Sequence, residues 1–416
     1  MRKALAEPLT PPTGADLAAL LQRASGAVIG GACGDALGVP HELAPAPTGT
    51  LNMTGGGLGP YQPAEWSDET QLAVCALEVT AAGGDLSCEF AQDALARRLL
   101  SWAKPATAAS PGKDTHTFEP ASQPGNLSGQ SSKPDENPGG RDMGAYTARV
   151  LQTALSPESH LAPDGGPSIL VAWSAQLAAQ RSLREPAGDL LALAPAIALS
   201  NLRSPSRCAK TASEIGAMLT AQDSVADGLV FCAEVVRGCV VGEVGPDFSA
   251  ALSAIPKRRR EFWADLVAGA AERNFAPSRD NGTATTAIGA AVSAVTYALQ
   301  EREYAPSSTW LRGVEAGIRA GGDTDTVAFL VGMFLGAAFG ESAVPAKLRA
   351  RVWGWPGMDA EALADLSHAT ALAALSGGGI QAAERAIAAL EVIKSAPRLE
   401  PELSDASSAP PTNDQC

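Results

Sequence analysis

Four glycines recur at every fourth position in the N-terminal part of the chain: Gly26, Gly30, Gly34 and Gly38. Residues four apart in a helix lie on the same face, so these glycines form one face without side chains. Glycine inside a helix costs about 1 kcal/mol relative to alanine, but it lets another backbone or a ligand approach closely. The sequence therefore predicts a helix over residues 16–38 whose glycine face packs against another helix or a ligand.

The rest of the chain is also helical in character. Alanine and leucine dominate, β-branched runs are scarce, and apolar residues recur at helical spacing, with no convincing alternating strand. This pattern predicts an all-α fold. The predicted helices cover residues 16–38, 70–82, 89–103, 143–155, 168–182, 207–220, 224–241, 260–272, 283–300, 309–319, 325–339, 360–375 and 379–395.

Two carboxylates lie immediately before a strongly apolar segment. Residues 321–326 read Gly-Gly-Asp-Thr-Asp-Thr and lead directly into the apolar run 327–336. Carboxylates beside a core need compensation, and a hard divalent cation supplies it through oxygen ligands. Helix capping is the alternative, but a cap needs one oxygen, whereas this segment offers two carboxylates and two hydroxyls. The paired glycines also permit unusual backbone angles, so metal binding is the favoured interpretation.

A second oxygen-rich cluster lies far upstream. Residues 67–70 read Ser-Asp-Glu-Thr and run into another apolar helix. Taken alone, this cluster is better explained as a helix N-cap with acidic residues at the positive end of the helix. Because two such clusters each precede a helix, they suggest one site assembled from distant parts of the chain.

A third motif connects the two clusters to a known family. Residues 34–42 read Gly-Asp-Ala-Leu-Gly-Val-Pro-His-Glu. The three motifs occur in the order Gly-Asp-Ala-Leu-Gly-Val-Pro-His-Glu, Ser-Asp-Glu-Thr and Gly-Gly-Asp-Thr-Asp-Thr. In this order they resemble the ADP-ribosylglycohydrolase family over roughly residues 24–340. The resemblance implies a hydrolase that cleaves an ADP-ribose glycosidic bond on a modified protein or on an ADP-ribose-containing small molecule.

The resemblance also implies a site with two ions, Mg²⁺ or Mn²⁺. Carried over by motif position, one ion has Ser67, Asp68 and Glu69 as ligands, the other has Asp323 and Thr326, and Asp325 bridges them. The implied catalytic residues are Asp323, Asp68 and Glu42.

Two acidic residues of the first motif have competing interpretations. Glu42 either positions substrate or water or is an ordinary surface carboxylate after a helix. Asp35 either supports the residues of the site from behind or is structural, as a helix C-terminal cap, and the structural interpretation is favoured.

The chain departs from the family pattern at three places. Residues 189–195 look like the stretch Gly-Asn-Gly-Ser-x-Met-Arg-x-Ala-Pro without its polar residues and arginine. Ala221 stands where histidine is usual, and Glu69 stands where aspartate is most frequent. A catalytically impaired ADP-ribose- or nucleotide-binding protein on the same fold therefore remains an alternative, as does another all-α metal-dependent hydrolase.

Length and composition bound the organisation. The 416 residues suffice for one large domain or two ordinary ones. Residues 104–142 are rich in proline and polar side chains, which fits either a surface insertion or a linker between domains. The insertion is favoured because the two acidic clusters lie on opposite sides of it and must meet. We therefore expect one domain over residues 16–396, with disordered tails at 1–15 and 397–416.

Charge and hydropathy limit the partners. The net charge is −14 without an extended basic patch, so nucleic-acid binding is not expected. The N-terminus has no apolar run of signal-peptide length, and the apolar segment 327–339 is too short to span a bilayer. We expect a cytoplasmic protein that does not associate with membranes.

Overall fold

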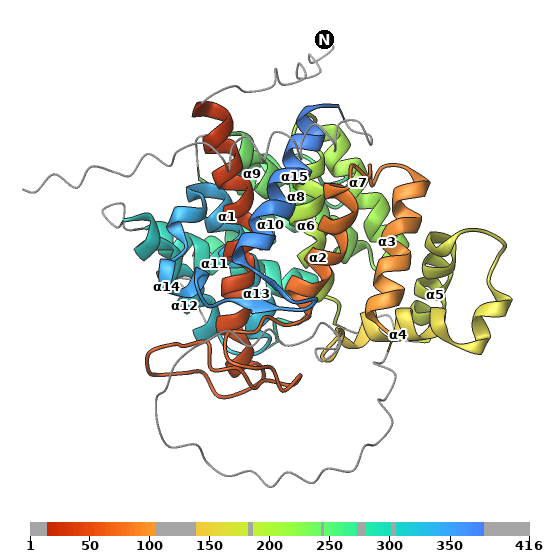
Figure 1. Ribbon diagram of the computed structural model, residues 1–416, viewed down its shortest axis with the longest axis horizontal. Coiled ribbons are helices and arrows are strands. Elements are labelled where there is room, and N and C mark those ends of the chain that lie inside the picture. The colour runs from red at the N-terminus through yellow and green to blue at the C-terminus, as the bar shows by residue number, and fades with distance from the viewer. Residues whose placement is uncertain are drawn as a thin grey trace, which may run out of the picture.

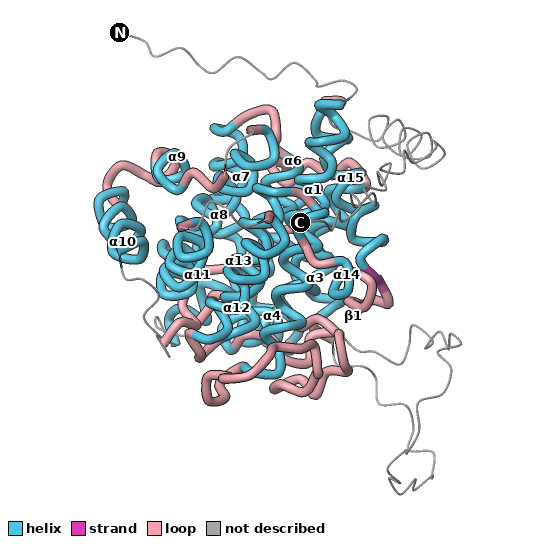
Figure 2. The backbone as a smooth tube through the Cα atoms, turned by 90° about the vertical axis from the view of Figure 1, so that its left-hand side faces the viewer, coloured by secondary structure: helices cyan, strands magenta, loops and turns pink. Residues whose placement is uncertain are grey.

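The computed structural model describes residues 15–104, 139–181, 186–242, 245–272, 280–300 and 305–377. Helices form nearly all of the regular structure in these ranges (Figures 1 and 2). The predicted all-α fold is confirmed. Residues 1–14, 105–138 and 378–416 lie outside the described part, and with them most of the predicted insertion, both predicted tails and the predicted helix 379–395.

The α-helices up to the middle of the chain are α1 (Ala15–Gly38), α2 (Asp68–Ala81), α3 (Glu89–Trp102), α4 (Ala145–Leu155), α5 (Pro167–Arg181), α6 (Ala194–Ser200), α7 (Pro205–Leu219) and α8 (Asp223–Val241). They are followed by α9 (Phe248–Leu252), α10 (Arg260–Glu272), α11 (Ala284–Leu299), α12 (Pro306–Arg319), α13 (Thr324–Phe339), α14 (Ala346–Arg349) and α15 (Ala360–Leu375). Short 3₁₀ helices are η1 (Val39–His41), η3 (Pro157–Leu161), η4 (Asp189–Leu193) and η5 (Glu341–Ala343).

Every predicted helix within the described residues is present. Helices α6, α9 and α14 were not predicted, because segments of four to seven residues are too short to show a helical period. A small antiparallel pair, β1 (Trp353–Gly354) with β2 (Met358–Asp359), is also additional to the prediction. None of the helices in the described part of the chain is both long and apolar enough to cross a membrane.

Helices α1 and α13 pack with their backbones in contact at the centre of the molecule (Figure 1). A Cβ atom on Gly30 would lie 2.3 Å from the carbonyl oxygen of Gly332, and one on Gly34 would lie 2.1 Å from that of Ala328. The contact is reciprocal, since a Cβ on Gly332 would lie 2.1 Å from the carbonyl oxygen of Gly30. The predicted glycine face therefore exists, and its partner is the helix that follows Gly-Gly-Asp-Thr-Asp-Thr.

The two helices run antiparallel, so the end of α1 meets the start of α13. A Cβ on Gly38 would lie 2.5 Å from the Cα of Asp325, and the Thr324 hydroxyl donates to the Gly38 carbonyl at 2.8 Å. The first and third sequence motifs are thus neighbours at one end of the helix pair. Loop backbone gathers on one side of the molecule, at the bottom of Figure 2.

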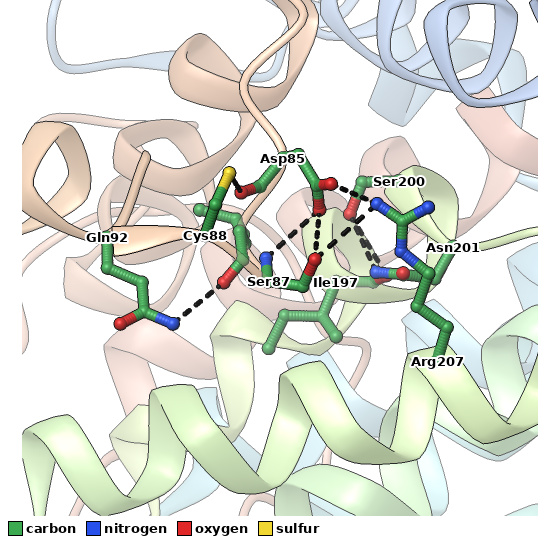
Figure 3. A network of polar contacts seen from close by, with 9 residues as sticks. Asp85, Ser87, Cys88, Gln92, Ile197, Ser200, Asn201 and Arg207 are labelled. Carbon is green, nitrogen blue, oxygen red and sulfur yellow. Dashed lines mark hydrogen bonds and ion pairs between the residues drawn. The ribbon is translucent and has the colours of Figure 1, made fainter. Parts of the chain in front are cut away.

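The far end of α2 is held by a separate polar network. Asp85, just beyond α2, accepts from the backbone N–H and the hydroxyl of Ser87 at 3.0 and 2.7 Å and forms an ion pair with Arg207 of α7 (Figure 3). In the same view Asn201 donates to the carbonyl of Ile197 at 2.9 Å. A cavity of about 200 Å³ lies here. Because α2 has 14 residues, this end is about 20 Å from its start.

We predict that Gly34→Ala will destabilise the protein strongly. The new Cβ would meet the Ala328 carbonyl at 2.1 Å, and a backbone atom within a packed helix cannot turn away as a flexible side chain can. We expect the free energy of unfolding to fall by about 3 kcal/mol, near the upper end for overpacked cores. Denaturant unfolding followed by circular dichroism measures this change.

Gly238→Ala is the matched control. Gly238 is an exposed glycine in α8 with no atom within 4 Å of its added Cβ. Alanine there should raise the free energy of unfolding by about 0.5–1 kcal/mol, because it is the better helix former. Equal effects of the two substitutions would contradict the close α1–α13 contact.

Candidate functional site

The start of α2 is capped by a side chain from α1. The buried Asp35 carboxylate accepts the backbone N–H groups of Ser67 and Thr70 at 2.9 and 3.1 Å and the Thr70 hydroxyl, and it lies within hydrogen-bond distance of the Ser67 hydroxyl. Ser67 occupies the N-cap position, yet its side chain makes no capping hydrogen bond. Local capping therefore does not explain residues 67–70, because Asp35 supplies the cap across the α1–α2 contact. Asp35 is therefore not the helix C-terminal cap favoured from the sequence, since it caps the start of another helix and contacts Ser67 of the second motif.

The turn before α13 is held by Asn281. Its side chain donates to the Gly321 carbonyl at 2.8 Å and accepts from the Asp323 N–H at 2.8 Å. Gly321 and Gly322 have φ of 75° and 76°, in the left-handed region that glycine adopts readily. Asp323 is the N-cap residue without a side-chain capping bond, so its carboxylate is available to the site.

Three carboxylates from the two clusters come together at this point. Glu69, Asp323 and Asp325 each offer an oxygen that lies within 4.8 Å of the other two. Glu69 accepts from the Ser67 hydroxyl at 2.9 Å and from the hydroxyl of Thr326 on α13, so it connects α2 with α13. An all-oxygen set of buried acidic groups suits a hard divalent cation such as Mg²⁺ or Mn²⁺.

The residues carried over from the family motifs are all brought together. Six of them line one cavity: Glu42, Asp68, Glu69, Asp323, Asp325 and Thr326. The seventh, Ser67, is buried behind the cavity, with its hydroxyl directed to Asp35 and Glu69. Five of the six predicted metal ligands therefore line the cavity and Ser67 does not, and metal ligation itself remains a prediction.

Two further acidic residues of the cavity were missed from the sequence, Asp142 and Asp189. Asp142 belongs to the predicted insertion 104–142, but the end of that segment contacts the helices around it. Gly140 donates its N–H to Gln71 at 2.9 Å, and Arg141 forms an ion pair with Glu65. No local pattern signals these two carboxylates, because only the tertiary fold brings them to the site.

The cavity carries a large excess of negative charge. Lys, Arg and His are absent from its lining in the described part of the chain. Burial, reinforced by the neighbouring Glu69, raises the pKa of Asp323 and of Asp35 to about 7 and that of Asp142 to about 6. Burial and the nearby Asp142 raise the pKa of Glu42 to about 9. Like charges held this close resist ionisation unless a cation offsets them.

Comparisons with known proteins agree with the motifs. The family profile described as ADP-ribosylglycohydrolase matches residues 16–381. Over 89 residues the chain is 37% identical to the ADP-ribosylarginine hydrolase Tri1 of Serratia proteamaculans (strain 568), a match that covers 21% of this chain and 24% of that protein. The chain thus spans about a quarter of the length of this curated relative.

A solved structure has the same fold. The chain matches an "ADP-ribosylglycohydrolase-related protein complex" with a TM-score of 0.56 and 21% sequence identity. The match covers 85% of this chain and 98% of the other chain. At this identity the likeness concerns the fold, which is therefore shared over nearly the whole of the solved chain.

We predict that Asn281→Ala will destabilise the turn before α13. The change leaves the Gly321 carbonyl and the Asp323 N–H without their buried partner. We expect the free energy of unfolding to fall by about 2–3 kcal/mol. The matched control is Asn52→Ala at an exposed asparagine, expected to change it by less than about 0.5 kcal/mol. Chemical denaturation of both variants measures the difference, and equal values would contradict the role of Asn281.

We also predict that the metal-free protein loses stability as pH rises. Asp35 and Asp323 have folded pKa values of about 7, against about 3.9 in an unfolded chain. Between these two pKa values the folded state therefore binds more protons than the unfolded state. The resulting contribution to the free energy of unfolding is complete below about pH 4 and is lost as pH rises through about 7.

Melting temperatures in the presence of a chelator should therefore fall between about pH 5 and pH 8. Excess Mg²⁺ or Mn²⁺ should reduce the fall, because a cation offsets the carboxylate charge at the higher pH. Differential scanning fluorimetry measures both series. A melting temperature that rises with pH under chelation would contradict the raised pKa values of the two carboxyl groups.

Proposed function

Because the chain belongs to the ADP-ribosylglycohydrolase family, we propose that it is a divalent-metal-dependent hydrolase that cleaves the bond between ADP-ribose and a modified side chain or small molecule. The observation that carries this proposal is the close group formed by the buried Glu69 and Asp325 and the half-buried Asp323, in a cavity without basic lining residues among those described. ADP-ribosylated arginine is the first substrate to test, because the name of the relative from Serratia gives it as that protein's substrate. The cytoplasmic location and the lack of nucleic-acid binding remain predictions.

The donor set fits two ions, Mg²⁺ or Mn²⁺. The proposed ligands are Ser67, Asp68, Glu69, Asp323, Asp325 and Thr326, with Asp325 shared. Asp325 is suited to be the shared ligand, since it belongs to the group with Glu69 and Asp323 and also lies 3.4 Å from the Ser67 hydroxyl. When bound, such a pair of cations would supply positive charge that orients ribose hydroxyls and activates water.

The protein residues would then bind, orient and accept a proton. In the proposed reaction a water oxygen bonds to the anomeric carbon, the glycosidic bond to the leaving atom breaks, and a proton from water ends on that leaving atom. Asp68 and Asp323 line the cavity on opposite helices, so each can accept a hydrogen bond from the water or from the ribose. Glu42 is only half-buried, which suits a group that positions the incoming substrate or water.

Binding without hydrolysis is the alternative that specific residues favour. The family arginine in residues 189–195 corresponds to Ala192, which is buried in the core, and the family histidine corresponds to Ala221. Neither alanine can contact substrate through a polar side chain. If those groups are essential, the chain would bind ADP-ribose on the same fold without turning a substrate over.

Release of ADP-ribose separates these functions. The full chain is incubated with ADP-ribosylated arginine and Mg²⁺ or Mn²⁺, and free ADP-ribose is measured by chromatography and mass spectrometry. We expect release that a chelator abolishes. Tight binding of ADP-ribose without release would favour the binding protein, and hydrolysis of phosphate esters alone would favour a different metal hydrolase.

We predict that Asp325→Asn will abolish binding of at least one metal ion. The carboxylate belongs to the tight acidic group, and an amide lacks its charge. Activity should fall by more than about 100-fold, since changes even to outer groups of metal sites cost 10–100-fold. Isothermal titration with Mn²⁺ measures binding, and circular dichroism confirms retained helix.

Asp85→Asn is the matched control for this substitution. It makes the same chemical change at the far end of α2, about 20 Å from the site. Metal stoichiometry and activity should stay at the wild-type values. Unchanged Mn²⁺ affinity in Asp325→Asn would remove Asp325 from the proposed ligand set.

A further inference from the structure

Asp189 is a buried acid without a hydrogen-bond partner. Its side chain is 5% exposed, and neither carboxylate oxygen has a hydrogen bond in the described part of the structure. The residue begins η4 and lines the same cavity as Asp68 and Asp323. A buried carboxylate without a hydrogen bond is costly. The Thr147 hydroxyl and the Leu190 N–H lie near enough to lower the pKa of Asp189 but complete no hydrogen bond to it, so a ligand in the cavity can supply the donors.

The acidic group proposed for metal binding does not use Asp189. Three of the proposed ligands, Glu69, Asp323 and Asp325, have oxygens within 4.8 Å of one another. Asp189 belongs neither to these three nor to the other proposed ligands. Burial raises the pKa of Asp189 to about 7, and the carboxylates of Glu69 and Asp323 act in the same direction, whereas the Thr147 hydroxyl lowers it. The neighbour that Asp189 lacks is therefore a cation or a donor of two N–H groups.

The backbone holds Asp189 firmly, and Gly144 lies against its carboxylate because it has no side chain. The preceding Gly188 donates its N–H to the Gly282 carbonyl at 3.0 Å, which fixes the segment against the loop before α11. A Cβ on Gly144 would lie 2.6–2.8 Å from the carboxylate atoms of Asp189. Gly144 donates its own N–H to Asp68 at 3.3 Å, so Asp68 and Asp189 flank this glycine on one wall of the cavity.

We propose that Asp189 determines specificity by accepting two N–H groups from the guanidinium of a modified arginine, the leaving group of the reaction. This inference rests on the proposed function. A guanidinium presents parallel N–H donors that match the two oxygens of one carboxylate, and both oxygens of Asp189 are available. A metal ion needs several ligands, whereas this contact needs one carboxylate outside the metal group. Asp189 also lies in the stretch where the chain departs from the family motif.

Binding of methylguanidine to the metal-loaded full chain tests this contact without turnover. Isothermal titration should show that Asp189→Asn weakens methylguanidine binding at least about tenfold, as expected for the loss of a charge-assisted bidentate pair. The control is Asp142→Asn, which removes one negative charge from the same cavity and should weaken binding much less. Equal weakening in both variants, or no binding to the wild type, would overturn the proposal.

Metal stoichiometry and substrate preference provide the second test. Asp189→Asn should bind as many Mn²⁺ ions as the wild type, and a lost ion would show that Asp189 is a metal ligand instead. The value of kcat/KM should fall about tenfold for ADP-ribosylated arginine but stay unchanged for ADP-ribosylated serine, which has no cationic leaving group. An equal fall for both substrates would contradict the proposed specificity.

Two further measurements keep the outcomes distinct. Thermal unfolding shows whether the Asp189→Asn variant folds. If that variant does not fold, the same measurements are made on Asp189→Ser, which places the family's serine at this position. A wild-type chain that releases ADP-ribose from no substrate rejects the proposed function. The methylguanidine titration then still decides whether Asp189 binds a guanidinium.

Discussion

The backbone contact between α1 and α13 is the constraint on which the site depends. Because glycines on both helices allow a separation that no side chain could enter, the register between the helices is fixed to within one residue. Thr324 is then tied to the last residue of α1, and Asp325 lies directly against it. Asp35, one turn earlier on α1, in turn fixes the start of α2 through the N–H groups of Ser67 and Thr70. The acidic residues of α2 and α13 therefore meet through α1, which contributes no proposed metal ligand itself.

This rigid frame explains how the protein tolerates its own acidic cavity. Buried carboxylates at short separation repel one another, and a looser assembly would relax by moving the helices apart. Here the repulsion acts on two helix starts that are held by the glycine contact, by the Asp35 cap and by the Asn281 clamp on residues 321–323. Burial and the neighbouring Glu69 raise the pKa of Asp323 and of Asp35 to about 7 in this frame. For the proposed cation, such a frame would reduce the cost of ordering the ligands on binding.

The parts of this picture that the sequence predicts are those with a local signature. The glycine period predicts close packing, the paired glycines before Asp323 predict an unusual turn, and two acidic helix starts predict a joint site. The sequence does not predict that Asp35 caps α2, since that capping pair is separated by more than thirty residues and depends on the α1–α2 contact. Asn281, Asp142 and Asp189 lie in segments without a periodic pattern, and only the assembled fold gives their side chains a common neighbour.

Glu69 shows how a departure from a family motif acquires a physical meaning. From the sequence, the extra methylene relative to aspartate suggests a carboxylate displaced from its usual place. In the structure that length lets one oxygen accept from Ser67 at the start of α2 while the other accepts from Thr326 on α13. The longer side chain thus joins the two helix starts and still contributes an oxygen to the group with Asp323 and Asp325. An aspartate at the same backbone position would withdraw from Thr326, so the glutamate serves both to connect α2 with α13 and to supply charge at the site.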